Sequence, residues 1–243
     1  MNRKLILIIG AQRSGKSYFS NELIKKYLQN GNSAIVYNLG KQTDFSAAKE
    51  VFLLTEKQHA VKLGKSYKEN PEFLFYEYNG KDLLFKNFCN DFSGKAIKSS
   101  RLDYKSEVMF LDAFYKYVSN SLLVIDDAKA IFRYGIKAEF LTLFSRLNHT
   151  GRHNPVINWQ SSGADVIIIF HSLDHINKDL FDFCTHIINF KYAMQPDFDK
   201  VENTQLKEQL KKSFNALNKA PQYSYTITDV HNLKTKIFIN NSN

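Results

Sequence analysis

Residues 10–17 read GAQRSGKS and match the phosphate-binding pattern G-x-x-x-x-G-K-[ST] at every fixed position. Glycines let backbone N–H groups approach phosphate oxygens closely, and a helix that begins directly after the loop points its positive dipole end at the same oxygens. Lys16 is expected to neutralise the β- and γ-phosphates, and Ser17 to bind Mg²⁺. The motif therefore predicts a site for ATP and Mg²⁺. The predicted nucleotide-binding residues are Gly10, Ala11, Gln12, Arg13, Ser14, Gly15, Lys16, Ser17 and Tyr18.

A second acidic element follows an apolar run at residues 122–127, which read LLVIDD. Four buried residues would deliver two carboxylates to the end of a strand, as in a Walker B motif. Asp126 is the predicted Mg²⁺ ligand, and Asp127 the predicted base that activates the attacking water. Paired acidic residues also occur at plain solvated strand ends, so this assignment depends on the phosphate-binding loop upstream.

Polar and basic residues near a third apolar run complete the candidate site. His171 follows residues 166–170 (VIIIF) and is a candidate sensor of the γ-phosphate. Its alternative role is to cap that strand or the helix expected after it. Arg146 and Arg152 lie in the segment SRLNHTGRH, which ends at His153. One of these arginines is a candidate arginine finger for a neighbouring subunit, and a solvated or DNA-contacting basic loop is the alternative.

Uninterrupted apolar runs that alternate with helical patterns predict an α/β fold, with a mainly parallel sheet covered by helices on both faces. The tail at 222–239 instead alternates between apolar and polar residues, which predicts a C-terminal β-hairpin turning at 229–232. Between residues 55 and 100 the pattern is mixed and indicates one strand. Expected strands are 5–9, 33–37, 73–78, 122–125, 166–170 and 187–190, and expected helices are 17–29, 108–117, 138–147 and 173–183.

The composition suits one globular domain over residues 1–243, with a core at about 4–191 and a C-terminal helix and hairpin at about 198–240. Cys89 and Cys184 lie in apolar surroundings without metal-type spacing, which favours a reduced intracellular setting. No run reaches the roughly 18 apolar residues of a membrane span, so we expect a soluble protein whose membrane contacts come through a partner.

A formal net charge of +9 favours a polyanionic partner such as DNA, held by its backbone without base recognition. The lysine-rich stretches 62–68 and 95–105 are candidate DNA contacts. Solvated surface is the alternative reading of each stretch.

The chain resembles the FtsK/HerA superfamily over about residues 4–191. The resemblance depends on the phosphate-binding loop, the Walker B-like motif, the Arg-His segment and the apolar strand that is followed by a polar residue. The compact size and the run GADVIIIFHSLDHINKDL look most like genome-packaging ATPases of membrane-containing icosahedral viruses, with Zot-like phage assembly ATPases second. The resemblance implies a RecA-like, additional-strand P-loop core that assembles as a ring, possibly a hexamer, and pulls DNA with ATP hydrolysis. It also implies partners at a capsid vertex or among phage membrane proteins, and a location in the virion or host cytoplasm. Its catalytic residues would be Lys16, Asp127, His171 and Arg152.

Three features depart from that family pattern. Asp127 stands where many relatives have Glu, His171 stands where many have Gln, and an extra segment NPVINWQSS follows the arginines. A shorter carboxylate at position 127 must lie closer to the lytic water or act through a second water.

Other P-loop classes fit the sequence less well. A GTPase is disfavoured because residues 126–129 (DDAK) are not D-x-x-G and residues 218–220 (NKA) lack the aspartate that recognises guanine. A small-molecule kinase shares the phosphate loop but usually lacks paired carboxylates. A phage export ATPase normally carries a transmembrane anchor. A role in which ATP only orders an assembly would leave Asp127 without a task.

Overall fold

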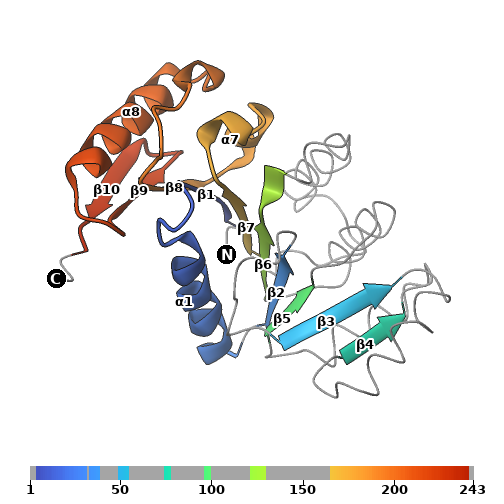
Figure 1. Cartoon of the computed structure of the whole chain (residues 1–243). Helices are drawn as coiled ribbons and strands as arrows, with labels where there is room; N and C mark the ends of the chain where they lie inside the picture. The colour runs from blue at the N-terminus through green and yellow to red at the C-terminus, as the bar shows by residue number, and fades with distance from the viewer. Residues whose placement is uncertain are drawn as a thin grey trace.

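The computed structural model describes residues 4–31, 33–38, 49–54, 74–77, 96–99, 121–129 and 165–240. Its strands form a ten-stranded sheet in the order β10-β9-β8-β1-β7-β6-β2-β5-β3-β4 (Figure 1). The strand bounds are β1 (Leu5–Ile9), β2 (Ser33–Asn38), β3 (Lys49–Leu54), β4 (Leu74–Glu77), β5 (Ala96–Ser99), β6 (Ser121–Asp126), β7 (Asp165–Phe170), β8 (His186–Phe190), β9 (Tyr225–Asp229) and β10 (Lys234–Phe238).

Strands β1 to β8 pair in parallel, whereas β9 runs antiparallel to both β8 and β10. This arrangement confirms the predicted mainly parallel sheet with a C-terminal hairpin. Strand β7 lies between β1 and β6, pairing Leu5 with Val166 on one side and Leu122 with Asp165 on the other. The strand inserted between the phosphate-loop strand and the acidic strand is the additional strand expected from the sequence.

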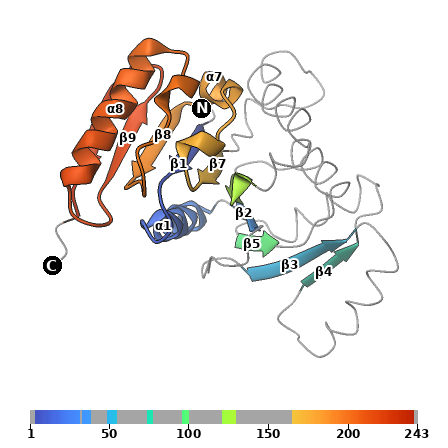
Figure 2. The same cartoon turned by 45° about the horizontal axis from the view of Figure 1, so that its top comes forward.

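Helices cover opposite faces of the sheet. Helix α1 (Lys16–Gln29) packs on β2 and β6, and helix α8 (Thr204–Lys219) packs on β8, β9 and β10 (Figure 2). Successive side chains of a strand point to opposite faces of the sheet. In the C-terminal hairpin, Thr235 of β10 donates a hydrogen bond to Gln209 of α8, so its face is the one that α8 covers. Tyr225 of β9 points to the other face and packs against Phe19 of α1. The predicted covering of both faces is therefore confirmed.

The core under α1 is built from alternate residues of neighbouring strands. Ile8, Val124, Ile167 and Ile169 are almost completely buried and pack with Ile24 of α1. Each such side chain contributes about 1.5–3 kcal/mol by leaving water. The apolar runs in the sequence are thus the strands that carry the site.

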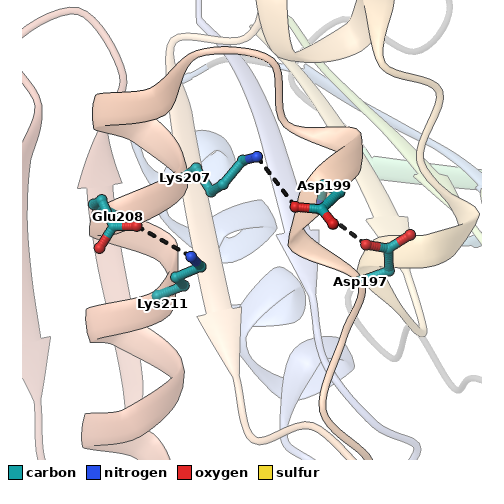
Figure 3. Close-up of polar contacts among 5 residues, drawn as sticks. All are labelled: Asp197, Asp199, Lys207, Glu208 and Lys211. Carbon is teal, nitrogen blue, oxygen red and sulfur yellow. Dashed lines mark hydrogen bonds and ion pairs between the residues drawn. The ribbon is translucent and has the colours of Figure 1, made fainter.

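Helix α8 begins where the side chain of Asn203 accepts a hydrogen bond from the backbone N–H of Leu206 at 3.0 Å. Its apolar residues are buried, while its polar face carries an ion pair between Glu208 and Lys211 at 3.1 Å (Figure 3). Lys207 pairs with Asp199, whose backbone N–H donates to Asp197 (Figure 3). These exposed pairs contribute little stability, so burial of the apolar face holds α8 in place.

Two details differ from the sequence-based expectation, and some expectations are not tested. Strands β3 and β5 were not predicted: β5 lies in the stretch 55–100, where the pattern is mixed, and the short run at β3 was not assigned. The helix expected at 173–183 is divided into a 3₁₀ turn, Leu173–His175, and helix α7, Asp179–Phe183, because Ile176 between them has extended backbone angles. The helices expected at 108–117 and 138–147, and Cys89, lie outside the described residues. Within the described part of the chain, no helix is long and apolar enough to cross a membrane.

Candidate functional site

Four parallel strands bring the predicted site residues to one edge of the sheet. Strand β6 ends at Asp126. The other three strands end directly before a site residue: β1 before Gly10, β7 before His171 and β8 before Lys191. Parallel strands share the direction of their carboxyl ends, and ligands of open α/β sheets bind at that edge. Residues that are far apart in the sequence therefore face one location.

The phosphate loop is anchored to both strands that flank β1. The N–H of Gly10 donates to the carbonyl of Phe170 at 3.3 Å, and the N–H of Ala11 donates to the carbonyl of Lys191 at 2.8 Å. A Cβ atom at position 10 would lie 2.7 Å from Cβ of Phe190, so only glycine fits there. Gly15 caps α1 with a φ of +102°, which favours glycine as well. The sequence pattern therefore reflects real steric limits on the loop.

Lys16 is buried at the first position of α1, with 5% of its surface exposed. Its Nζ donates to the carbonyl of Gly10 at 2.7 Å and to the carbonyl of Ala11. Burial lowers the pKa of Lys16 to about 8, although the nearby Asp126 acts to raise it. A bound phosphate would add negative charge beside this ammonium group and favour its protonated form.

The lowered pKa of Lys16 predicts that ATP affinity falls as the pH rises above about 8. Below this pKa the ammonium form is present and binds phosphate, whereas above it binding must first take up a proton. The loss approaches about tenfold per pH unit until the pKa of the bound state is reached. Calorimetry of ATP binding in two buffers of different ionisation enthalpy should detect proton uptake near pH 8. Lys25→Ala, an exposed lysine of the same helix, should leave that uptake unchanged, and an absence of uptake in the natural protein would contradict the assignment.

Asp127 and His171 form the second part of the site. Oδ1 of Asp127 lies 3.9 Å from Nε2 of His171, and both side chains are partly exposed. Asp127 has a φ of +51°, and aspartate tolerates this left-handed conformation better than glutamate does. The backbone thus accounts physically for the shorter carboxylate at this position.

Burial lowers the pKa of His171, and the positive charge of Lys16 lowers it further, while Asp127 and Asp126 oppose the shift. The imidazole is therefore mainly neutral at neutral pH. Its Nδ1 is buried without a hydrogen-bond partner among the described residues. A neutral ring of this kind can donate a hydrogen bond to an incoming oxygen without introducing a full charge.

The oxygen atoms at this edge suit Mg²⁺ and phosphate. Ser17 and Asp126 would hold Mg²⁺, because hydroxyl and carboxylate oxygens are the hard ligands that this ion prefers. The Oγ atom of Ser14 is buried and has no partner in the part of the chain that the structure describes, which leaves it for a ligand. Three predicted nucleotide-binding residues, Gln12, Arg13 and Tyr18, are exposed. Among the described residues, no group of three or more His, Cys, Asp and Glu side chains could hold a different metal.

Some predicted residues lie outside this geometry, and two residues of the site region were not predicted. Arg146, Arg152 and the lysine stretch 62–68 fall outside the described residues, and of 95–105 only the backbone of β5 is described. Lys191 anchors Ala11, and Tyr223 lies beside Gly15, where an added Cβ would be 3.3 Å from Cδ1 of the tyrosine. The position of Lys191, directly after an apolar strand, was a weak indication that it belongs to the site. No local sequence pattern indicated that Tyr223 lies near the loop.

Solved structures resemble the chain over nearly its whole length. The genome packaging NTPase B204 from Sulfolobus turreted icosahedral virus 2, in complex with AMPPCP, has a TM-score of 0.61 and 17% sequence identity, covering 98% of each chain. Its complex with AMP has a TM-score of 0.63. The chain has a RecA-like P-loop NTPase fold. This result confirms, at the level of the fold, the likeness to genome-packaging ATPases that the sequence suggested.

A more distant P-loop NTPase structure agrees. VirB4 of Thermoanaerobacter pseudethanolicus has a TM-score of 0.53 at 10% identity, covering 98% of this chain and 89% of the other. No protein-family model matches the sequence, and no curated protein sequence is significantly similar to it. The similarity to solved proteins is therefore found by comparing tertiary structures, whereas the P-loop motif is visible in the sequence itself.

Proposed function

We propose that this chain is an ATPase that translocates DNA and packages a viral genome into a preformed capsid. The proposal depends chiefly on the strand ends, which gather Lys16, Asp126, Asp127 and His171 at one edge with β7 inserted between β1 and β6. It is supported by the shared fold of B204, which is a genome packaging NTPase, over 98% of this chain. The packaging vertex of the virion or the host cytoplasm is the corresponding location.

The chemistry of the proposed reaction is hydrolysis of the terminal phosphate of ATP. Lys16 neutralises the β- and γ-phosphates, and Mg²⁺ bound by Ser17 and Asp126 supplies further positive charge. Asp127 accepts a proton from water while the water oxygen bonds to the γ-phosphorus and the bond to the ADP oxygen breaks. His171 donates a hydrogen bond to the γ-phosphate and senses its departure. The 3.9 Å separation from Asp127 lets the histidine respond to the protonation of the base.

The proposed assembly is a homo-oligomeric ring, possibly a hexamer, with ATP between subunits. Arg152, or Arg146, would reach the ATP of the neighbouring subunit as an arginine finger. The ring would bind DNA through phosphate contacts, without base recognition, and attach to capsid-vertex or phage membrane proteins. The net charge of +9 suits such a polyanionic substrate.

ATP hydrolysis in the presence of long DNA tests this function. We expect DNA to raise the hydrolysis rate several-fold, regardless of its sequence, and added salt to abolish the increase because it competes with phosphate contacts. Phosphate release would be measured across a salt series with two DNAs of different base composition. Lys16→Ala serves as the control for contaminating ATPases.

Two results would contradict the packaging proposal. Hydrolysis that is indifferent to DNA would favour an export ATPase or a small-molecule role for the same fold. Strong preference for one DNA sequence would contradict backbone binding and point to a sequence-specific partner.

A further inference from the structure

The order of the strands places different residues on the two sides of the phosphate loop, and one of these sides is where the γ-phosphate of ATP is expected. Strands β7 and β6, which carry His171 and the two carboxylates, lie on one side of β1. Strands β8 and β9 lie on the other side. A nucleotide with its γ-phosphate near Asp127 can therefore extend its nucleoside toward β8 and β9, on the other side of the loop.

An aromatic surface lies on that second side, on the face that α1 occupies. Phe19 packs against Phe190 and Tyr225, with ring centroids 5.9 and 5.0 Å apart, and Tyr225 stacks on Phe238 at 4.8 Å. Helix α8 packs on the opposite face of these strands, and Phe238 remains 38% exposed. Phe19 of α1 thus covers Phe190, which is 2% exposed, whereas Phe238 at the edge of the cluster keeps part of its ring open.

Tyr223 is the member of this region that reaches the loop itself. It lies in the turn that connects α8 to β9, where the N–H of Ser224 donates to the carbonyl of Pro221 at 3.3 Å. Its ring approaches Gly15 so closely that a Cβ there would be 3.3 Å from Cδ1, yet the residue is 48% exposed. The ring therefore touches the loop with one edge and leaves much of its surface open to a ligand.

We propose that Tyr223 stacks on the base of the bound nucleotide and is the main protein contact of that base. This inference rests on the proposed function, because it requires the triphosphate to occupy the loop at residues 10–17. A neutral, flat base matches an exposed aromatic ring, and stacking on such a ring is tolerant of base identity because every base has an aromatic face. The contact orients the nucleoside without reading its edges.

Binding of ATP and of inorganic tripolyphosphate, both with Mg²⁺, tests the proposal by calorimetry. Tyr223→Ala should weaken ATP affinity about tenfold and leave tripolyphosphate affinity unchanged, since only ATP has a base. Tyr223→Phe keeps the ring and should retain the affinity of the natural protein for ATP. Ile239→Ala, an exposed apolar residue beyond β10, is the matched control and should affect neither ligand.

The outcomes separate this inference from the proposed function. If the natural protein binds both ligands but Tyr223→Ala loses neither or loses both equally, the base contact is overturned while the phosphate site stands. Equal affinity of the natural protein for ATP and tripolyphosphate would overturn it too. If the natural protein binds neither ligand, the nucleotide function fails, and the inference fails with it. Thermal unfolding of both tyrosine variants should match that of the natural protein, which excludes a folding defect as the cause of lost ATP binding.

Discussion

Lys16→Ala is expected to reduce ATP affinity by roughly 30-fold to several-thousand-fold, which corresponds to about 2–5 kcal/mol for truncating one partner of a buried charge pair. Lys16 is the buried cation of the phosphate loop, held by the carbonyls of Gly10 and Ala11. Without it the phosphates would enter a site that retains Asp126 as a nearby negative charge. ATP binding should be measured by calorimetry and by the rise in unfolding temperature that ATP causes.

Lys25→Ala is the matched control for this experiment. Lys25 lies on the same helix, but it is exposed and, among the described residues, forms its ion pair with Glu22 at 2.7 Å, so its removal should change ATP affinity less than twofold. Loss of Lys16 also removes the cost of burying an ammonium group, so the fold itself should be retained. Unchanged ATP affinity in Lys16→Ala would rule out the loop as the phosphate site.

Asp127→Asn is expected to lower the rate of ATP hydrolysis by about 10²- to 10⁴-fold while ATP still binds. The amide cannot accept a proton from water, whereas asparagine keeps the size of the side chain and tolerates the φ of +51° at this position. The change therefore removes the chemistry without straining the backbone. Single-turnover phosphate release and calorimetric ATP binding would separate the two effects.

Asp199→Asn is the control for Asp127→Asn, because Asp199 is highly exposed and, within the described part of the chain, pairs with Lys207 and the nearby turn. It should hydrolyse ATP at the normal rate. If Asp127→Asn retained hydrolysis while Asp126→Asn lost it with ATP still bound, the roles given to the two carboxylates would be reversed. Combining Asp127→Asn with His171→Ala would then show through non-additive rates whether the 3.9 Å pair acts as a unit.

Local sequence patterns were sufficient for the elements that carry the site. The apolar runs at β1, β6, β7 and β8 are buried on both faces of a parallel sheet, so their burial is visible as continuous hydrophobicity. The short strand β5 lies where the pattern is mixed, and the helix expected at 173–183 is interrupted at Ile176. Interruptions of this kind depend on single backbone angles, which periodicity does not reveal.

The sequence by itself determined the conformation of the loop at residues 10–17, because the loop pattern is a steric requirement. Gly10 lies too close to Phe190 for any side chain, and Gly15 has a positive φ that favours glycine. The two glycines in the sequence therefore indicate the conformation of the loop. The alternation of residues in the tail likewise determined the hairpin, since one face of β9 is buried and the other is not.

Only the tertiary structure decided which residues meet. The placement of β7 between β1 and β6 brings His171 to 3.9 Å from Asp127, and the turn after α8 brings Tyr223 to Gly15. Strand order arises from pairing between segments that are distant in the chain, and it is stabilised by burial summed over the whole sheet. No short segment of the sequence contains the information on which strands pair. The contacts between Asp127 and His171 and between Tyr223 and Gly15 are therefore seen only in the folded chain.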